Sequence, residues 1–375
     1  MKEWRLAMVR QRYRSDGGGE VFVSRALEAL AQHNLDLNVI TREWQGSCNS
    51  NWHIHICNPL KVSRLSRERG FAEAARSLWQ KKLFDLVQSH ERIPGCDIYR
   101  AGDGVHRRWL LQRARIMSEW RRKWLFSNKY HRYVMCSERA MYAAPELKAV
   151  ICNAEMTKQE IIDDFDVAAD KITVIYNAIN NKEFIPADAE MRQVLRAQYR
   201  IPQQAHCLIF VGSGFKRKGL TCAIRALANT DSHLLVVGQD KAEKQYLAFV
   251  RSLGYSQRVH FMGVQKHILP FYQMADALLL PTLYDSFPNA VLEAMSCGLP
   301  VITTTTCGGS EFITPGQNGF ITDALDIAGI TEMIHALPRQ ALGSSMGAAA
   351  RARIMSATPA YLSTQLIALY QRLLD

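Results

Sequence analysis

Short apolar runs alternate with longer amphipathic segments along most of the chain. The short runs predict buried strands, and apolar residues at helical spacing predict that the segments between them are helices. This alternation is typical of parallel sheets whose strands are joined by covering helices. In the first half we expect strands at 5–9, 35–40, 97–99, 133–135, 149–151 and 172–175, and helices at 21–31 and 158–165.

The pattern breaks around residues 176–180, where a polar stretch with prolines begins, and it restarts after Pro202. The chain is therefore expected to be α/β, with two Rossmann-like, doubly wound domains at 1–178 and 179–356. A helix at 357–375 is expected to pack back toward the first domain. Ligands of such sheets bind at the carboxyl ends of the strands, so we expect the two domains to face a central cleft. The later strands are expected at 207–212, 234–237, 259–261, 277–280 and 299–302, and a final amphipathic helix at 361–374.

Composition fits a folded protein of two domains. The chain has 375 residues, of which 48% are hydrophobic and 22% charged. No apolar run approaches the roughly 18 residues of a membrane-spanning helix, and the first residues lack the pattern of a signal peptide. The nine cysteines are odd in number and show no C-x-x-C spacing, which favours reduced thiols in the cytoplasm over disulfides or a zinc site.

Positive charge is concentrated in one segment. Residues 60–140 hold 19 lysines and arginines against 8 aspartates and glutamates, a net charge of +11, which equals that of the whole chain. Such a field attracts an anionic partner: a phospholipid surface, a phosphorylated glycolipid or a nucleic acid. The alternative is a solvated basic face without a partner.

Three loops at expected strand ends carry candidate chemistry. The first, residues 16–20, contains Gly18 and Gly19 and precedes an expected helix, so its backbone can approach an anion closely. It lacks the G-x-G-x-x-G spacing of dinucleotide enzymes, which disfavours hydride transfer. By itself the loop is equally compatible with a tight turn.

The second loop, residues 212–219, places Arg217 and Lys218 between glycines, just before an expected helix. Cations at such a position can neutralise a diphosphate leaving group. The spacing is not that of a Walker loop, because Lys218 precedes Gly219. An exposed basic turn is the alternative.

The third loop follows the expected strand 277–280 and leads into a helix near residue 288. Asp285 in the loop can accept hydrogen bonds from sugar hydroxyls, and Glu293 in the helix can hold a ribose diol. The first amides of that helix, at Asn289 and Ala290, can face phosphate oxygens. The alternatives are a helix cap for Asp285 and a buried ion pair for Glu293.

These motifs resemble the retaining GT-B glycosyltransferases of family 4. Asp285 and Glu293 enclose seven residues, and the sequence Ala-Met-x-x-Gly-x-Pro-Val follows; the family's usual form has glutamate at both ends. Within the family, residues 96–106 are similar to a loop of the transferases that add a hexose or hexuronic acid to the inner-core heptose of lipopolysaccharide. Further matches are the glycine-rich first loop, Phe215-x-Arg-Lys-Gly, Val237–Asp240 and Val174–Ile179.

The resemblance implies a role for each candidate residue. Arg217 and Lys218 would hold the donor diphosphate, Glu293 the ribose and Asp285 the donor hexose, while Gly18 and Gly19 would approach phosphate and sugar. Asp103 and His106 would contact donor sugar or acceptor; a structural hydrogen bond within their loop is the alternative. The implied donor is a UDP-sugar, and the implied reaction retains configuration without a protein nucleophile or a metal cofactor.

Asp164-Phe165-Asp166 has the D-x-D form that another glycosyltransferase fold uses to hold a divalent ion. Because it ends an expected helix and does not follow a strand, we interpret it as a solvated helix terminus. No metal site is therefore expected.

The basic segment favours peripheral docking on an anionic membrane surface, which the resemblance implies to be the cytoplasmic face of the inner membrane. Trp120 and Trp124 fall on one helical face, and aromatic residues mixed with cations are typical of docking on anionic lipid. No nucleic-acid module is present, so nucleic acid is not an expected partner. The residues concerned are Arg107, Arg108, Trp109, Arg113, Arg115, Trp120, Arg121, Arg122, Lys123 and Trp124.

Other readings remain open at this point. The same fold could serve a nucleotide-sugar epimerase or free-sugar synthase, a transferase with a protein, phosphoinositide or other glycolipid acceptor, or a glycan-binding protein without activity. Arg217, Lys218 and Glu293 argue against a pure binder, which has no use for diphosphate ligands. The donor sugar stays open among glucose, galacturonic acid, galactose and N-acetylglucosamine.

Overall fold

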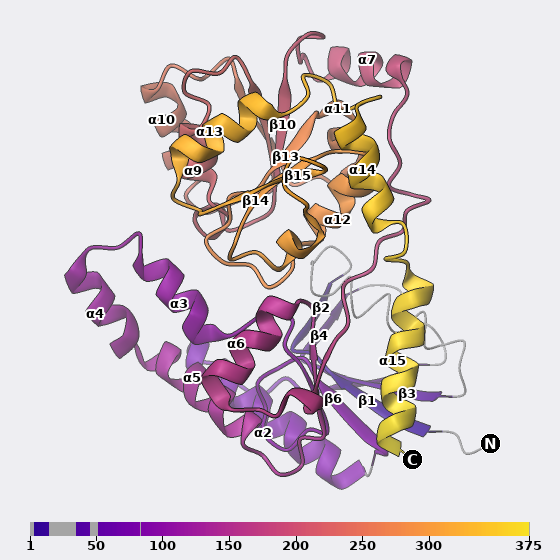
Figure 1. Ribbon diagram of the computed structural model, residues 1–375. Coiled ribbons are helices and arrows are strands. Elements are labelled where there is room, and N and C mark those ends of the chain that lie inside the picture. Colours follow the sequence, from indigo (N-terminus) through magenta and orange to yellow (C-terminus); the bar gives the residue numbers. More distant parts are fainter. Residues whose placement is uncertain (1–3, 15–34, 46–51, 83, 375) are drawn as a thin grey trace. The chain divides into compact units, whose positions relative to one another are not determined.

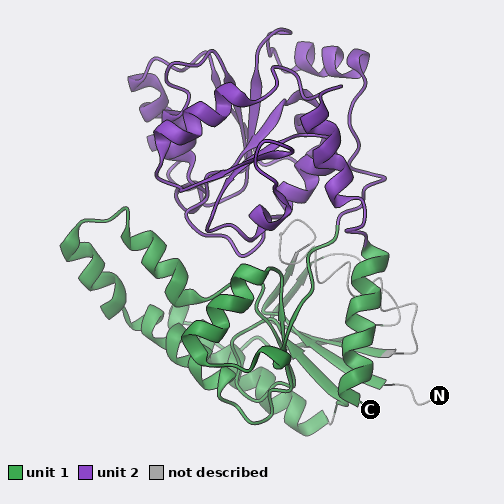
Figure 2. Ribbon diagram, viewed as in Figure 1, with its two compact units in different colours: residues 1–178, 359–375 green, residues 179–358 purple. Residues whose placement is uncertain are grey.

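The structure is a computed structural model that describes residues 4–14, 35–45, 52–82 and 84–374. Its contacts divide the chain into two compact units, residues 1–178 with 359–375 and residues 179–358 (Figure 2). Each unit contains a parallel sheet whose strands are joined by helices (Figure 1). The helix expected at 21–31 and the glycine loop at 16–20 lie outside the described residues.

The first unit is built on a seven-stranded sheet in the order β5-β3-β1-β6-β7-β8-β9, and every neighbouring pair is parallel. Beside it, β2 and β4 form a short two-stranded sheet. The strands are β1 Trp4–Val9, β2 Arg12–Arg14, β3 Leu35–Thr41, β4 Glu43–Gln45, β5 Trp52–Ile56, β6 Leu86–Ser89, β7 Ile98–Arg100, β8 Ala149–Cys152 and β9 Ile172–Val174.

Both faces of this sheet are covered, because successive residues of a strand point to opposite faces. Leu6 and Met8 belong to a core that also contains Leu366 and Tyr370 of the last helix, α15. The opposite face packs against α2, α5 and α6. The helices are α2 Arg64–Lys82, α3 His106–Ala114, α4 Glu119–Ser127, α5 Lys129–Tyr142, α6 Glu155–Phe165 and α15 Pro359–Leu374, with a 3-10 turn at Ala169–Lys171.

The second unit holds a six-stranded parallel sheet in the order β12-β11-β10-β13-β14-β15. The first strand of the unit therefore lies between the second and the fourth, and the order of strands reverses between β10 and β13. The strands are β10 Cys207–Val211, β11 His233–Val237, β12 Val259–Gly263, β13 Ala277–Leu279, β14 Val301–Thr304 and β15 Gly319–Thr322. The helices are α7 Ala189–Gln198, α8 Phe215–Lys218, α9 Leu220–Arg225, α10 Glu243–Ser252, α11 Leu269–Met274, α12 Asn289–Ser296, α13 Ile327–Ala336 and α14 Ser345–Ile354, with a 3-10 turn at Gly308–Phe312.

One expected strand is a helix. Residues 133–135 lie inside α5, whose N-cap Asn128 accepts hydrogen bonds from the amides of Tyr130 and His131. Val134, Glu138 and Met141 are buried at spacings of four and three, which places them on one helical face. The strand prediction was wrong because a short apolar run does not distinguish a strand from a buried helical segment.

The Asp164-Phe165-Asp166 segment also differs from expectation. α6 ends at Phe165 and Asp166 adopts a left-handed backbone with φ +56°, as at many helix ends. The Asp164 side chain is only 8% exposed, however, and it pairs with Arg108 at 2.8 Å. The segment is therefore not fully solvated: Asp164 joins α6 to α3.

Candidate functional site

Two of the predicted loops meet in the second unit. The 212–219 loop follows β10 and the Asp285 loop follows β13, and these two strands are neighbours in the sheet. Loops that leave the carboxyl ends of adjacent strands lie side by side, and a reversal of strand order opens space for a ligand between them. Arg217 and Lys218 of α8 are in this way brought to Asp285, which lies 68 and 67 residues further along the chain.

The three side chains form one ionic cluster. Arg217 Nη1 lies 2.5 Å, and Lys218 Nζ 2.6 Å, from the same oxygen, Oδ2 of Asp285. Burial alone would raise the pKa of Asp285, but the charges of Lys218 and Arg217 lower it to about 2. The carboxylate is therefore ionised at neutral pH, and two cations facing one anion leave a net charge of +1. Such a cluster can attract an anionic ligand.

The close approach of the two loops requires glycine at position 219. Gly219 adopts φ +80°, and a Cβ there would lie 1.8 Å from the carbonyl oxygen of Pro281. The contact is fixed further by the carbonyl of Arg217, which accepts a hydrogen bond of 2.9 Å from the amide of Leu283. A larger residue at 219 would separate the cations from Asp285.

α12 carries the remaining predicted donor contacts. Pro288 is its N-cap and no side chain caps it, so Asp285 is not the helix cap that was one alternative. Glu293 accepts a 2.7 Å hydrogen bond from the hydroxyl of Tyr272, a buried residue of α11. Burial and the nearby Glu293 charge raise the pKa of Tyr272 well above its ordinary value, so the hydroxyl keeps its proton and fixes the carboxylate. One partner of Glu293 is thus a neutral donor.

In the first unit, Asp103 and His106 follow β7 at the carboxyl edge of the sheet. Asp103 is exposed. His106 begins α3, and its Nε2 lies 3.0 Å from Nδ1 of His131 in α5. Burial, with the charges of Arg92 and His131 next in size, lowers the pKa of His106 to about 3, so its ring is neutral near pH 7. A neutral imidazole can share a hydrogen bond with a hydroxyl, but it does not supply a proton as imidazolium.

A buried carboxylate that sequence reasoning missed, Glu138, holds this loop in place together with Arg92. Glu138 of α5 accepts hydrogen bonds from the His106 amide at 3.1 and 3.2 Å and from Arg92 Nε at 2.7 Å. Arg92 also donates to the carbonyl of Gly104 at 3.2 Å. The structural hydrogen bond considered for the loop is therefore present at the backbone of His106, while the role of its ring stays a prediction. No local signal distinguished Glu138, because it lies in the middle of a helix among polar neighbours.

Comparison with known proteins assigns each half of the fold. Residues 16–183 match the family described as Glycosyltransferase Family 4, and residues 191–353 match the family described as Glycosyl transferases group 1. The chain is 25% identical over 327 residues to the lipopolysaccharide glucosyltransferase WaaG of Escherichia coli (strain K12), covering 84% of each chain. The crystal structure of WaaG superposes with a TM-score of 0.81 at 22% identity, over 97% of this chain and 99% of that one.

The chain belongs to the GT-B glycosyltransferases. The matches to the two family models lie side by side along almost the whole sequence, and the doubly wound sheets agree with the GT-B fold. A second relative, the lipopolysaccharide core biosynthesis glycosyltransferase LpsE of Rhizobium meliloti, is 24% identical over 321 residues, 85% of each chain. The structure of Anabaena HepE in complex with UDP-glucose has a TM-score of 0.72 at 17% identity, over 99% of this chain and 100% of that one.

Within this glycosyltransferase, the predicted residues are brought together to different degrees. Asp285 is in direct contact with Arg217 and Lys218. Asn289, Ala290 and Glu293, the other predicted donor-binding residues of this region, lie in α12, which begins four residues after Asp285. Gly18 and Gly19 lie outside the described residues, so their part in donor binding stays a prediction. Among the described residues, no group of three or more histidine, cysteine, aspartate or glutamate side chains could hold a metal ion, and no helix has the length and apolar character to cross a bilayer.

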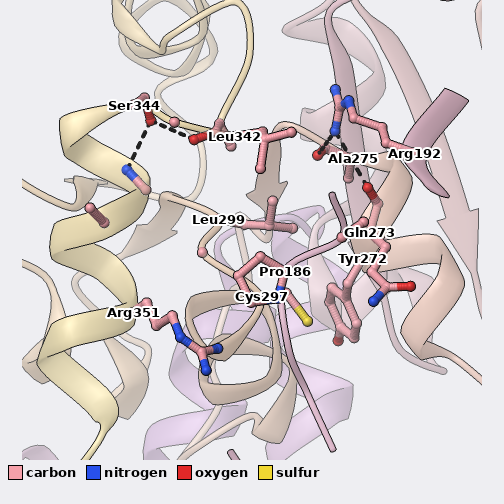
Figure 3. A pocket seen from close by; sticks show the side chains of 16 residues that line it. Pro186, Arg192, Tyr272, Gln273, Ala275, Cys297, Leu299, Leu342, Ser344 and Arg351 are labelled. Atoms are coloured by element: carbon pink, nitrogen blue, oxygen red, sulfur yellow. Dashed lines mark hydrogen bonds between the residues drawn. The ribbon is translucent and has the colours of Figure 1, made fainter. Parts of the chain in front are cut away.

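A pocket in the second unit lies away from these loops. Its lining includes Ala275 and Leu299, which precede β13 and β14, so the pocket faces the amino ends of the strands (Figure 3). Arg192, also in the lining, donates to the carbonyl of Ala275 at 2.8 Å and is engaged within the protein. Arg217, Lys218 and Asp285 lie at the opposite, carboxyl ends, whereas Glu293 accepts a hydrogen bond from Tyr272, which is part of the pocket lining.

Proposed function

We propose that this glycosyltransferase moves a hexose or hexuronic acid from a UDP-sugar to the inner-core heptose of lipopolysaccharide, with retention of configuration. The observation that carries the donor half is the Arg217–Lys218–Asp285 cluster at the switch point of the second sheet. The acceptor half is supported by the two relatives, WaaG and LpsE, whose names refer to lipopolysaccharide. UDP is supported by HepE, whose structures include complexes with UDP and UDP-glucose.

In this proposal the protein binds the UDP-sugar through its diphosphate and its ribose. Arg217 and Lys218 neutralise the diphosphate, and the first amides of α12, at Asn289 and Ala290, donate to its oxygens. Glu293, fixed by Tyr272, accepts from the ribose hydroxyls. Asp285 keeps the two cations in position and accepts hydrogen bonds from the donor hexose.

The reaction exchanges one glycosidic bond for another. The bond between the anomeric carbon and the diphosphate oxygen breaks, and the acceptor hydroxyl forms a new bond to that carbon from the same face. The acceptor's proton passes to an oxygen of the departing diphosphate, whose growing charge is stabilised by Arg217 and Lys218. No protein nucleophile and no metal cofactor are required. Asp103 and the neutral ring of His106 orient donor sugar and acceptor.

The proposal is tested by incubating the purified chain with UDP- and GDP-sugars and a truncated lipopolysaccharide core, and weighing the acceptor by mass spectrometry. We expect a gain of one hexose or hexuronic acid with a UDP-sugar, and none after Glu293→Ala. Inversion of the transferred sugar, read by NMR of the product, would contradict retention. Release of sugar from the donor in the absence of acceptor would favour an epimerase or free-sugar synthase. Transfer of sugar to a different glycolipid, and not to the lipopolysaccharide core, would identify that glycolipid as the acceptor.

A second prediction concerns the surface of α4. Trp120 and Trp124 are each 67% exposed and lie one turn apart, and the guanidinium of Arg121 lies 4.9 Å from the Trp120 ring centroid. Exposed aromatic rings beside cations fit peripheral docking on an anionic membrane, here the cytoplasmic face of the inner membrane. The double substitution Trp120→Ser with Trp124→Ser is expected to weaken binding to vesicles of anionic phospholipid by about tenfold.

Sedimentation of the protein with such vesicles measures this binding. Tyr361→Ser is the control, because Tyr361 of α15 is 56% exposed but lies outside the basic segment. If the control loses as much vesicle binding as the double variant, or if the double variant loses none, α4 is not the part of the protein that contacts the membrane.

A further inference from the structure

A cluster of basic and aromatic side chains forms around the first turns of three helices of the first unit, together with Arg113 from the last turn of α3. Arg64 is the first residue of α2 and His106 the first of α3, while Tyr130 and His131 lie in the first turn of α5. Arg113 lies seven residues after His106 and hence on the same side of α3. We call Arg64, His106, Arg113, Tyr130 and His131 the basic cluster.

Direct contacts join four of the five members. The His106 and His131 rings have centroids 5.1 Å apart, with the 3.0 Å contact between their nitrogens. The His131 ring centroid lies 5.5 Å from that of Tyr130. The guanidinium carbon of Arg64 lies 3.8 Å from the centre of the Tyr130 ring. Arg64, His106, Tyr130 and His131 therefore form one continuous group contributed by three helices, and Arg113 is close enough for its charge to lower the pKa of His131.

The positive charge of this group is not balanced by nearby carboxylates. Burial lowers the pKa of Arg113, and the positive charge of Arg64 lowers it further; no carboxylate in the described part of the chain acts in the opposite direction. Burial likewise lowers the pKa of His131, followed by the charges of Arg113 and Arg64. Among the described residues, no acidic side chain forms an ion pair with Arg64 or Arg113. Arg113 is half-buried, whereas Arg64 is exposed. A partly buried guanidinium group that lacks a counter-charge is stabilised when an anion joins it.

The nearest acidic side chains already have partners. Glu138 is paired with Arg92, and Glu68 accepts from Gln11 at 2.7 Å and from Arg67 at 2.8 Å. The helix amides are also occupied, since Asn128 caps α5 and Glu138 accepts from the first amide of α3. An anion at this place would therefore be recognised by side chains.

We propose that the basic cluster binds a phosphate monoester carried by the sugar acceptor. Guanidinium groups bind phosphate oxygens through paired hydrogen bonds, and the imidazole and phenol groups add further donors. The cluster adjoins the loop of Asp103, at the edge of the sheet where the acceptor contacts are predicted. This inference rests on the proposed function, because it names a chemical group of the acceptor.

The first test measures phosphate binding without any transfer reaction. Inorganic phosphate is titrated by calorimetry into the full chain saturated with UDP, which occupies Arg217 and Lys218, at constant ionic strength. Binding is expected, and Arg113→Gln and Arg64→Gln should each weaken it by about tenfold or more. Arg139→Gln, which removes an exposed charge from the last turn of α5, should leave it unchanged. No binding, or equal loss in all three variants, would overturn the proposal.

The second test compares acceptors that carry or lack phosphate on the sugar. Arg113→Gln should raise KM for the phosphorylated acceptor about tenfold, to the level of the dephosphorylated one, and leave kcat unchanged. A similar rise in KM for both acceptors would overturn the assignment. So would a parallel loss of binding to anionic vesicles, which would identify a phospholipid headgroup as the ligand.

The two proposals fail in different ways. If the wild-type chain transfers no sugar to either acceptor, the proposed function fails, while the phosphate titration is unaffected. If transfer proceeds normally and the titration shows no difference between Arg113→Gln and Arg139→Gln, only the phosphate site is lost.

Discussion

Replacing Lys218 with methionine is expected to lower kcat for sugar transfer by about 100- to 1,000-fold. The ammonium group of Lys218 is buried, and it lies beside Asp285 at the end of β10, where the departing diphosphate is proposed to gain charge. A positive charge held there before the reaction begins stabilises the transition state without reorganisation. A loss of this size corresponds to about 3–4 kcal/mol of transition-state stabilisation.

The substitution Lys218→Met removes the charge of the side chain but keeps most of its packing. The aliphatic part of the side chain passes close to Gly212, where a Cβ would lie 3.1 Å from the Lys218 Cε, and methionine retains most of that stem. Asp285 keeps Arg217 as its partner at 2.5 Å, so the carboxylate is not left unpaired. The loss should therefore be chemical, and KM for the donor should change less than kcat.

Lys216→Met provides the matched control. Lys216 belongs to the same short helix, but its side chain is exposed. Steady-state rates with a UDP-sugar and the lipopolysaccharide core should be within about twofold of wild type for this variant. Comparable losses at both positions would point to the general charge of the loop, and a small loss at Lys218 would exclude it from leaving-group stabilisation.

The meeting of Lys218 with Asp285 shows how far a sequence predicts a site of this kind. Both residues were singled out from their places after apolar strands. Their contact depends on β10 and β13 being adjacent, a feature of strand order that local pattern does not contain. The sequence therefore predicted the chemical groups and the edge of the sheet, but not that one carboxylate would face two cations.

Partners that come from distant helices were beyond local reasoning for the same reason. Glu293 was recognised as a carboxylate in apolar surroundings that needed a partner, but Tyr272 lies 21 residues earlier on α11, and only tertiary packing joins them. Glu138 was missed altogether, because a polar residue in the middle of a helix gives no sign that it will be buried. The predicted strand at 133–135 failed on the same helix, where long-range packing selects the buried face of α5.

Asp276→Asn is expected to destabilise the second unit by about 3–5 kcal/mol. Asp276 is completely buried just before β13, and its two oxygens accept from Arg192 at 2.5 Å and Arg196 at 2.9 Å. It also accepts from the amide of Cys207, the first residue of β10, at 2.8 Å. Asparagine keeps the shape but removes the charge, and it turns an amide NH₂ toward groups that are themselves donors. Two buried guanidinium groups would then lack a counter-charge.

The measurement must report on the second unit alone. All seven tryptophans lie within residues 4–124, so their fluorescence reports on the first unit. Hydrogen exchange of the β10 and β13 amides, followed by mass spectrometry, reads the second unit directly and should accelerate by about 100-fold or more in Asp276→Asn. Asp231→Asn is the control: Asp231 pairs with Arg339 at 2.6 Å on the surface, where such pairs contribute about 1 kcal/mol or less. Equal acceleration in the two variants would contradict the view that burial gives the Asp276 pair its effect. Asp276 joins α7 to the starts of β10 and β13, and the loops that follow these two strands carry Lys218 and Asp285. Loss of the Asp276 charge should therefore also weaken donor binding, although Asp276 does not touch the donor site.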